Sequence, residues 1–362
     1  MKIDLKELDL RETEQWITGL GFEGYRAGQV RQWIFKRLAN SFAEMTNLSK
    51  ELRVILENKA CISQLEKIKT QVSSDGTQKY LFRLKDGHLI ESVLIPERDH
   101  DTLCISSQVG CAMGCRFCLT GDQGLKRNLT PSEIIDQVIH TKQSLNNPER
   151  LKNIVLMGMG EPLANFDAVK KALINLLNED GMNFSKRRIT LSTCGLVPQI
   201  KKLGHELNVK LAISLNAADD KTRNSLMPVN RKYPLKSLIK ACKQFPLPRG
   251  ERITFEYILI KEVNDRDKDA ERLAELLSGL RTKINLIPLN PHRGTHMTPP
   301  AMERILKFQD ILIKKHFTTI IRKSRGRDIS AACGQLSGEM EETSQNKSRN
   351  LKILENELLL SD

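Results

Sequence analysis

Three closely spaced cysteines are the side chains of this sequence best suited to bind a metal. Cys111, Cys115 and Cys118 stand in the run Cys-Ala-Met-Gly-Cys-Arg-Phe-Cys, a C-x3-C-x2-C spacing that supplies three thiolates from one short loop. A [4Fe-4S] cluster takes one thiolate per iron, so three ligands leave one iron open to bind and reduce a substrate. Phe117 precedes the last cysteine, where an aromatic ring would shield the cluster. The spacing therefore predicts a catalytic [4Fe-4S] cluster with one open iron.

A structural zinc site is the alternative for the same cysteines. Zinc in such sites is held by four protein ligands, usually drawn from two separated pairs. The sequence contains no second C-x2-C pair. The ligand count therefore favours the iron–sulfur cluster over zinc.

Length and composition indicate a globular protein with more than one part. The chain has 362 residues, about twice a common domain length, so we expect a large domain with a smaller one attached. It is 40% hydrophobic and 28% charged, which excludes the disordered class. No apolar run is long enough to span a bilayer, and the N-terminus lacks the apolar core of a signal peptide. We therefore expect a cytoplasmic protein without a membrane partner, whose eight cysteines serve metal and redox chemistry rather than a disulfide framework.

The charge balance favours a polyanionic partner. The net charge is +13, and basic residues gather at 126–127, at 186–188 and at 322–327, near predicted strand ends or the cysteine loop. Such clusters suit an RNA phosphate backbone close to the chemistry. A solvated protein face is the alternative for each run.

The first hundred residues predict a small module of helices and a β-hairpin. Arg26–Ala39 and Leu48–Leu56 carry apolar residues at helical spacing. Tyr80–Leu84 and His88–Ile95 flank an Asp-Gly pair, a strong hairpin signal. We expect an N-terminal accessory domain over residues 1–97.

Short β-branched runs alternate with helical segments from Thr102 onward. The strands that we expect are Thr102–Ser106, Asn153–Gly158, Arg188–Thr193, Lys210–Leu215, Arg252–Ile260 and Lys283–Leu289, with Thr318–Lys323 as a possible edge strand. Repeated βα units predict an α/β fold with a parallel sheet. Length and strand count favour an open six-unit βα barrel over a doubly wound sheet. This core would cover residues 98–338, followed by a polar and then helical tail at 339–362 to which we assign no chemistry.

The cysteine loop follows the first predicted barrel strand, so the cluster would lie at the carboxyl ends of the strands, where such barrels place their chemistry. The next strand ends in the run Met-Gly-Met-Gly-Glu-Pro from Met157 to Pro162. Its glycines would let the backbone approach a ligand closely.

Taken together, these motifs resemble the RlmN family, the radical S-adenosylmethionine (SAM) adenine-C2 methyltransferases of large-subunit ribosomal RNA. The resemblance runs from about Phe22 to Leu336 and rests on the stretches Cys104–Cys111, Cys111–Cys118, Gly158–Pro162, Lys186–Thr193, Asn285–Pro291 and Asp328–Gln335. It implies a radical SAM partial (βα)6 barrel preceded by an RNA-binding module. The positions that it assigns to SAM binding are Gly160, Glu161, Ser192, Ser214, Leu215, Asn216 and Asn290.

The resemblance also implies the reaction. Adenine C2 is electron-poor and does not attack the methyl group of SAM, so a radical route is needed. The family uses two SAM molecules per turnover to methylate C2 of one adenine in 23S rRNA and, in the anticodon loop, of some tRNAs. Cys333 matches the cysteine that carries the methyl group, Cys104 the thiol that releases the product by forming a disulfide, and Glu91 the base. The resemblance further implies an electron donor such as flavodoxin, and we expect a monomer.

Strand alternation places Glu91 on the same side as Leu89 and Val93, where a partly apolar environment would raise its pKa; a surface glutamate is the alternative.

One position departs from the family, which usually has His where this chain has Asn216. Two other functions stay open at this point. One is methylation of adenine C8 by a related radical SAM enzyme that shares the cluster and both extra cysteines, and the other is a non-catalytic iron–sulfur RNA-binding protein. The stretch from Arg322 to Arg327 favours the C2 enzymes.

Overall fold

The computed structural model describes residues 2–292 and 294–338, so the predicted tail at 339–362 lies outside the described residues. The barrel strands are β6 (Asp101–Cys104), β9 (Leu151–Leu156), β10 (Ile189–Thr193), β11 (Lys210–Ser214), β12 (Ile253–Leu259), β13 (Thr282–Pro288) and β14 (Thr319–Ile321). Each neighbouring pair from β6 to β14 is parallel. The six predicted barrel strands and the edge strand are therefore confirmed.

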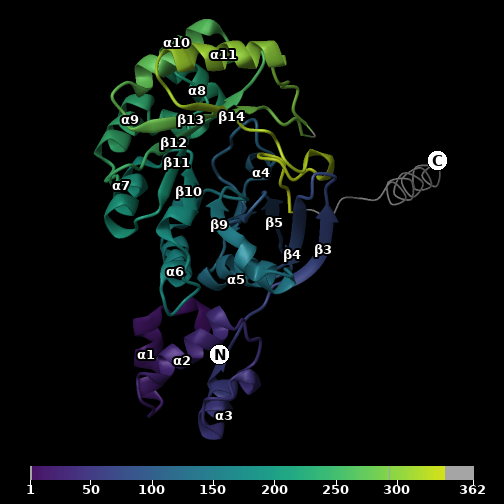
Figure 1. Ribbon diagram of the computed structural model, residues 1–362, viewed down its shortest axis with the longest axis vertical. Helices are drawn as coiled ribbons and strands as arrows, with labels where there is room; N and C mark the ends of the chain where they lie inside the picture. Colours follow the sequence, from purple (N-terminus) through teal and green to yellow (C-terminus); the bar gives the residue numbers. More distant parts are fainter. Residues whose placement is uncertain (1, 293, 339–362) are drawn as a thin grey trace, which may run out of the picture.

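The strand order identifies the sheet as an open barrel. The barrel strands lie side by side in chain order, from β6 to β14. A doubly wound sheet would reverse its order at a switch point, and this sheet does not. The helices between the strands are α5 (Pro131–Ser144), α6 (Phe166–Leu177), α7 (Val197–Glu206), α8 (Asp220–Leu226), α9 (Leu235–Gln244), α10 (Asp267–Leu277) and α11 (Met302–Lys314). Figure 1 shows α7, α9, α10 and α11 on the outer side of the curved sheet.

The predicted hairpin extends the barrel sheet. It consists of β4 (Gln78–Arg83) and β5 (Leu89–Pro96), and β5 pairs antiparallel with β6. A further strand, β3 (Glu66–Val72), pairs with β4 at the sheet edge and was not predicted. The sheet therefore continues across the boundary that we expected at residue 97, and it brings the hairpin beside the barrel.

The N-terminal helices α1 (Leu10–Gly19), α2 (Arg26–Arg31) and α3 (Lys50–Lys59) lie below the barrel in Figure 1. The helix predicted over 26–39 is α2 followed by a π-helix over Gln32–Lys36, and it ends before Leu38, which adopts a left-handed φ of 56°. Arg31 is fully buried and donates from Nη2 to Oδ1 of Asn175 at 2.7 Å. A buried ion pair between Lys6 and Asp136 makes a second link to the barrel. Among the described residues, no helix has the length and apolar character needed to cross a bilayer.

Candidate active site

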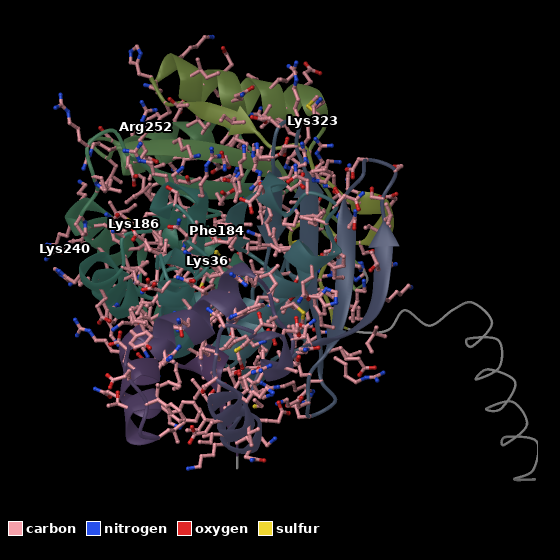
Figure 2. The ribbon with its side chains drawn as sticks, turned by 60° about the horizontal axis from the view of Figure 1, so that its bottom comes forward. Lys36, Phe184, Lys186, Lys240, Arg252 and Lys323 are labelled. Carbon is pink, nitrogen blue, oxygen red and sulfur yellow. The ribbon has the colours of Figure 1, made fainter. Side chains whose placement is uncertain are left out.

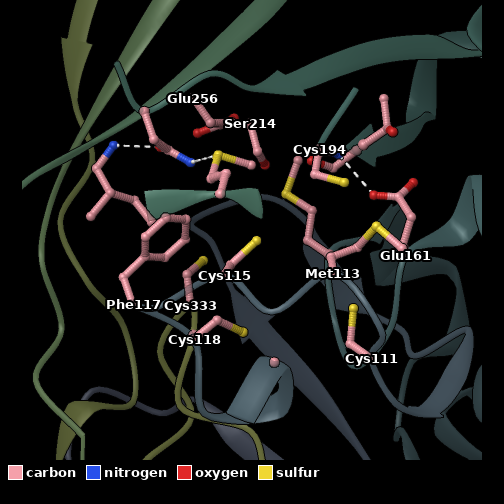
Figure 3. Close-up of a pocket in the computed structure, with 18 of the residues that line it drawn as sticks. Cys111, Met113, Cys115, Phe117, Cys118, Glu161, Cys194, Ser214, Glu256 and Cys333 are labelled. Carbon is pink, nitrogen blue, oxygen red and sulfur yellow. Dashed lines mark hydrogen bonds between the residues drawn. The ribbon is translucent and has the colours of Figure 1, made fainter. Parts of the chain in front are cut away.

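A cavity opens at the carboxyl ends of the parallel strands, as predicted. Cys111, Cys115 and Cys118 line it together with Phe117. Figure 3 shows these side chains with Glu161 and Glu256 around the same space. Much of the remaining lining comes from strands β9 to β13 or from the residues that directly follow them. The fold therefore brings the three predicted ligands to the mouth of the barrel.

The local sequence explains the shape of the cysteine loop, which lies between β7 (Gln108–Gly110) and the short helix α4 (Leu119–Asp122). The backbone N–H of Cys118 donates to the carbonyl of Cys115 at 3.0 Å. Gly121 packs against this turn so closely that a Cβ would lie 3.0 Å from the Cys115 nitrogen. Phe117 is buried and packs with Leu226 in an apolar cluster that Cys115 and Cys118 adjoin.

The donor set fits a [4Fe-4S] cluster. Burial raises the pKa of all three ligand thiols, to about 12 for Cys111, and a thiol that binds iron gives up its proton. The chain also has His292 and His296 at an H-x3-H spacing. Within residues 2–292 and 294–338, however, no three Cys, His, Asp or Glu side chains come close enough to surround one metal ion. Cluster ligands bind separate irons, so they need not converge on one point as zinc ligands do.

The glycines after β9 allow two chain segments to meet. A Cβ on Gly158 would lie 2.7 Å from the carbonyl oxygen of Ile105, and one on Gly160 would lie 2.5 Å from Cβ of Gln108. Gly160 also has a left-handed φ of 98°. The two glycines are therefore needed for packing against the segment that leads to the cysteine loop, whether or not they also approach a ligand.

Glu161 organises the floor of the cavity. Its carboxylate accepts from the backbone N–H of Leu163 at 3.0 Å and from that of Cys194 at 2.8 Å. Burial raises its pKa, although these hydrogen bonds oppose the shift. Each carboxylate oxygen keeps a further acceptor site, so a ligand amino group could still bind there.

The other predicted SAM positions fall into three groups. Ser192, Ser214 and Asn216 line the main cavity with Gly160 and Glu161. Leu215 is fully buried and lines no cavity described here. Asn290 lines an adjoining cavity, where its Nδ2 donates to the Cys333 carbonyl at 3.3 Å. Its Oδ1 is buried without a hydrogen-bond partner among the described residues, so it is free to bind a ligand donor.

Asn216, the departure from the family, has a structural role. Its Oδ1 accepts from the backbone N–H of Ile258 at 2.9 Å, and its Nδ2 lies 3.3 Å from Sδ of Met227. Its φ of 60° is left-handed, a conformation that Asn adopts more readily than most residues. The Asn216 side chain therefore ties the end of β11 to β12.

Cys104 and Cys333 line the adjoining cavity together. Cys333 also lines the main cavity, and it is exposed because its surface faces these two spaces. Burial raises the pKa of both thiols, to about 12 for Cys104. Both are free thiols in the structure. The structure thus brings together two cysteines that are far apart in the sequence.

Two charged residues of this space were missed as site residues in the sequence. Glu256 on β12 lines the main cavity; its Oε1 accepts from Asn285 at 2.9 Å, and its buried Oε2 has no partner among the described residues. Burial raises its pKa, and nearby Arg322 opposes the shift. Arg322 lines both cavities and lowers the pKa of both Cys104 and Cys333 against the effect of burial. The sequence did contain a sign that Glu256 is a site residue, because it is an acidic residue inside the otherwise mostly apolar strand β12.

Arg223 and Cys194 were also missed. Arg223 is fully buried and donates to the carbonyls of Leu215 at 3.0 Å and Cys194 at 2.7 Å, and to Oδ1 of Asn230 at 2.8 Å. It therefore fixes the ends of β10 and β11. Cys194, which we expected only to pack, lines the main cavity.

Glu91 is buried, which excludes the surface alternative. It lies on the same face of β5 as Val93, which lines the adjoining cavity, but Glu91 itself lines neither cavity. The sequence did not predict the polar partners of its carboxylate. Its Oε1 lies 3.0 Å from Nζ of Lys79, and its Oε2 accepts from the backbone N–H groups of Ser337 at 2.8 Å and Gly338 at 3.0 Å.

Only one of the three basic runs lies at the cavities. Residues 322–325 line the adjoining cavity. Lys186–Arg188 precede β10, at the opposite end from the cavity, and Figure 2 shows Lys186 and Lys323 on separate parts of the molecule. Arg127 is paired with Glu133 at 2.8 Å and with Asp86. The expectation that all three runs lie near the chemistry is therefore wrong for Lys186–Arg188.

Comparison with known proteins agrees with this geometry. Residues 105–276 match the model of the radical SAM superfamily, and residues 3–62 match the model of the ribosomal RNA large subunit methyltransferase N-terminal domain. The chain is 54% identical to the dual-specificity RNA methyltransferase RlmN of Geobacter sulfurreducens, over 94% of this chain and 93% of that protein. It is 53% identical to the RlmN of Geotalea uraniireducens, over 94% and 98% of the two chains. The crystal structure of a radical SAM methyltransferase from Sphaerobacter thermophilus superposes with a TM-score of 0.88 at 46% identity, covering 93% of this chain and 100% of that one.

Proposed function

The chain belongs to the RlmN family of radical SAM RNA methyltransferases, and we propose that it methylates adenine C2 in 23S rRNA and in the anticodon loop of some tRNAs. Family membership implies a [4Fe-4S] cluster and SAM. One observation supports the proposed chemistry most strongly. Cys333 lines both the cavity of the cluster ligands and the cavity that contains Cys104, as a methyl carrier between two reaction partners must.

The first step takes place on Cys333. Its thiolate attacks the methyl carbon of one SAM, so that a new carbon–sulfur bond forms while the methyl–sulfonium bond breaks and S-adenosylhomocysteine leaves. Arg322, which lines both cavities, favours the charged form of this thiol.

The second step joins the protein to the RNA. Cys111, Cys115 and Cys118 would hold the cluster, which together with a second SAM would supply the one-electron chemistry for removing a hydrogen atom from the S-methyl group and for taking up the electron released after the addition. The methylene carbon on the Cys333 sulfur bonds to adenine C2, and Glu91 accepts the C2 proton.

The third step releases the product. The Cys104 thiolate bonds to the Cys333 sulfur, which gives a disulfide. The bond between that sulfur and the methylene carbon breaks, and its electron pair stays on the carbon, which takes a proton and becomes the methyl group. The electrons balance, because the two sulfur atoms give up two electrons when the disulfide forms and the carbon gains them. The protons balance as well, because the Cys104 thiol loses one proton and the carbon takes one up.

The proposal includes the partners and the division of the chain. Residues 1–97 would contribute to RNA binding and supply Glu91, residues 98–338 would carry the cluster, SAM and both reacting cysteines, and the target adenine would leave its stack to reach the barrel mouth. An external one-electron donor such as flavodoxin would reduce the cluster, and the enzyme would act as a cytoplasmic monomer. Mass spectrometry of rRNA and tRNA from cells with and without the gene would identify the modified adenines.

Two cysteine variants test the mechanism. Cys333→Ala should keep the cluster, lack S-methylcysteine and form no product, because no sulfur remains to carry the carbon. Cys104→Ala should still methylate Cys333 but trap a covalent adduct between protein and RNA. Free turnover to 2-methyladenine by Cys104→Ala, without adduct, would refute the assigned roles.

A further inference from the structure

Glu91 has one partner on the sheet and two on the segment that carries Cys333. We refer to residues 326–338 as the Cys333 segment. The backbone N–H groups of Ser337 and Gly338 belong to this segment, and both donate to Oε2 of Glu91, at 2.8 and 3.0 Å. The third partner is Lys79, whose Nζ lies 3.0 Å from Oε1 and belongs to the sheet strand β4.

The Cys333 segment lies over Glu91 in this structure. Glu91 is 2% exposed and lines neither cavity, so an adenine bound in either cavity does not reach its carboxylate. Left-handed φ angles at Gly326, Ser330, Gly334 and Gly338 interrupt the segment at regular intervals. If Glu91 takes the C2 proton, the end of the segment must first leave it.

Departure of the segment changes the electrostatics of Glu91. The carboxylate then loses two hydrogen-bond donors, and burial without donors disfavours a charged carboxylate. Accepting the C2 proton requires the charged carboxylate. Lys79 is held by β4, which pairs with β5 on either side of Glu91, so its ammonium group stays beside the carboxylate. Lys79 is itself 5% exposed, and water therefore screens this ion pair little.

We propose that Lys79 is a positioning residue for the transfer of the C2 proton: it keeps the Glu91 carboxylate in place and ready to accept that proton once the Cys333 segment has moved. This inference rests on the proposed function. Lys79 Nζ also lies 3.4 Å from the carbonyl oxygen of Ser330, so the same group contacts the beginning of the segment. Lys79 does not touch the reacting atoms and acts through Glu91.

The test compares Lys79→Met with Lys79→Arg and with a control that loosens only the segment. Asp328 accepts from Oγ of Ser73 at 2.5 Å and from the backbone N–H of Ser74 at 3.0 Å, so Asp328→Ala weakens the segment without touching Glu91. Each cluster-loaded full-length variant is incubated anaerobically with SAM, reductant and 23S rRNA. Mass spectrometry measures S-methylated Cys333 and 2-methyladenine, and a denaturing gel measures the covalent protein–RNA adduct.

Lys79→Met should reach the wild-type level of S-methylated Cys333, accumulate adduct, and form product about a hundredfold more slowly, the range expected for loss of an effective base. Lys79→Arg should restore most of the product, and Asp328→Ala should not accumulate adduct. The inference fails if Lys79→Met resolves its adduct at the wild-type rate, if it loses S-methylation, if Lys79→Arg is equally defective, or if Asp328→Ala traps the same adduct.

A further variant separates this failure from failure of the proposed function. If Glu91→Gln traps the adduct while Lys79→Met does not, Glu91 remains the base and only the role of Lys79 is wrong. If Glu91→Gln turns over freely, the proposed base itself is wrong, and the role of Lys79 falls with it.

Discussion

The acidity of Cys104 gives a quantitative test of the release step. Burial raises the pKa of this thiol to about 12, with a smaller contribution from the neighbouring charge of Cys333, while Arg322 acts in the opposite direction. At pH 8 only about one Cys104 in ten thousand is then a thiolate. Because the thiolate is the form that reacts, alkylation of Cys104 should speed up about tenfold for each pH unit from 7 to 10, without levelling off.

The assay uses the cluster-loaded protein without RNA, treated anaerobically with iodoacetamide at each pH, quenched with acid and analysed by peptide mass spectrometry. Cys242 is an internal control, because burial raises its pKa to about 12 as well, but it is 1% exposed and lines neither cavity. It should show the same pH dependence and a much lower rate. Arg322→Met should slow the alkylation of Cys104 over this whole range, because it removes a cation that favours the thiolate.

A rate that levels off below pH 9 would refute this reasoning, since the Cys104 thiol would then be far more acidic than its burial allows. An unchanged rate in Arg322→Met would show that this cation does not act on Cys104. If both predictions hold, the free enzyme keeps its resolving thiol protonated. The thiolate would then form only when RNA binding or segment movement changes the surroundings of Cys104.

Three further predictions concern the cofactors and the barrel. Replacing any one ligand cysteine by Ala should abolish cluster absorbance and SAM cleavage together, and cleavage without the absorbance would reject the cluster site. Gly160→Ala should weaken SAM binding in equilibrium dialysis and destabilise the fold by about 1–3 kcal/mol, because the new Cβ would meet Gln108 at 2.5 Å at a left-handed φ; wild-type binding and melting would contradict this. Arg223→Met should lower the free energy of unfolding by about 3–5 kcal/mol, because it leaves buried carbonyl groups without a donor, while Arg223→Lys should lose less; equal thermal melting of all three proteins would exclude this role.

The barrel strands could be predicted because each is a short, buried, β-branched run between helices, and parallel strands are buried on both faces. Strand β3 could not, because it is a mostly exposed edge strand with the sequence Glu-Lys-Ile-Lys-Thr-Gln-Val, which lacks a clear apolar alternation. The end of the helix at Leu38 was missed for a different reason. A left-handed leucine is set by tertiary packing and leaves no mark in the local pattern.

In the site, too, features within one short segment could be predicted, whereas contacts between residues far apart in the sequence could not. That Cys111, Cys115 and Cys118 lie together could be predicted because all three are on one loop. The contact between Glu256 and Asn285 could not, because it depends on the register of β12 against β13. The ion pair between Lys79 and Glu91 likewise depends on the register of β4 against β5. Strand alternation correctly placed Glu91 on an inner face, but only the return of the chain at Ser337 showed that the carboxylate is covered.

The placement of the two extra cysteines supports the different roles that the proposed mechanism gives them. Acidity does not distinguish them, because burial raises the pKa of both Cys104 and Cys333. Position does. Cys333 lies on the wall that the two cavities share, together with Arg322, whereas Cys104 lines only the cavity away from most of the predicted SAM positions. Under the proposed mechanism, SAM can therefore methylate Cys333 and not Cys104, and Cys104 stays unmodified until the RNA adduct brings the linking sulfur to it.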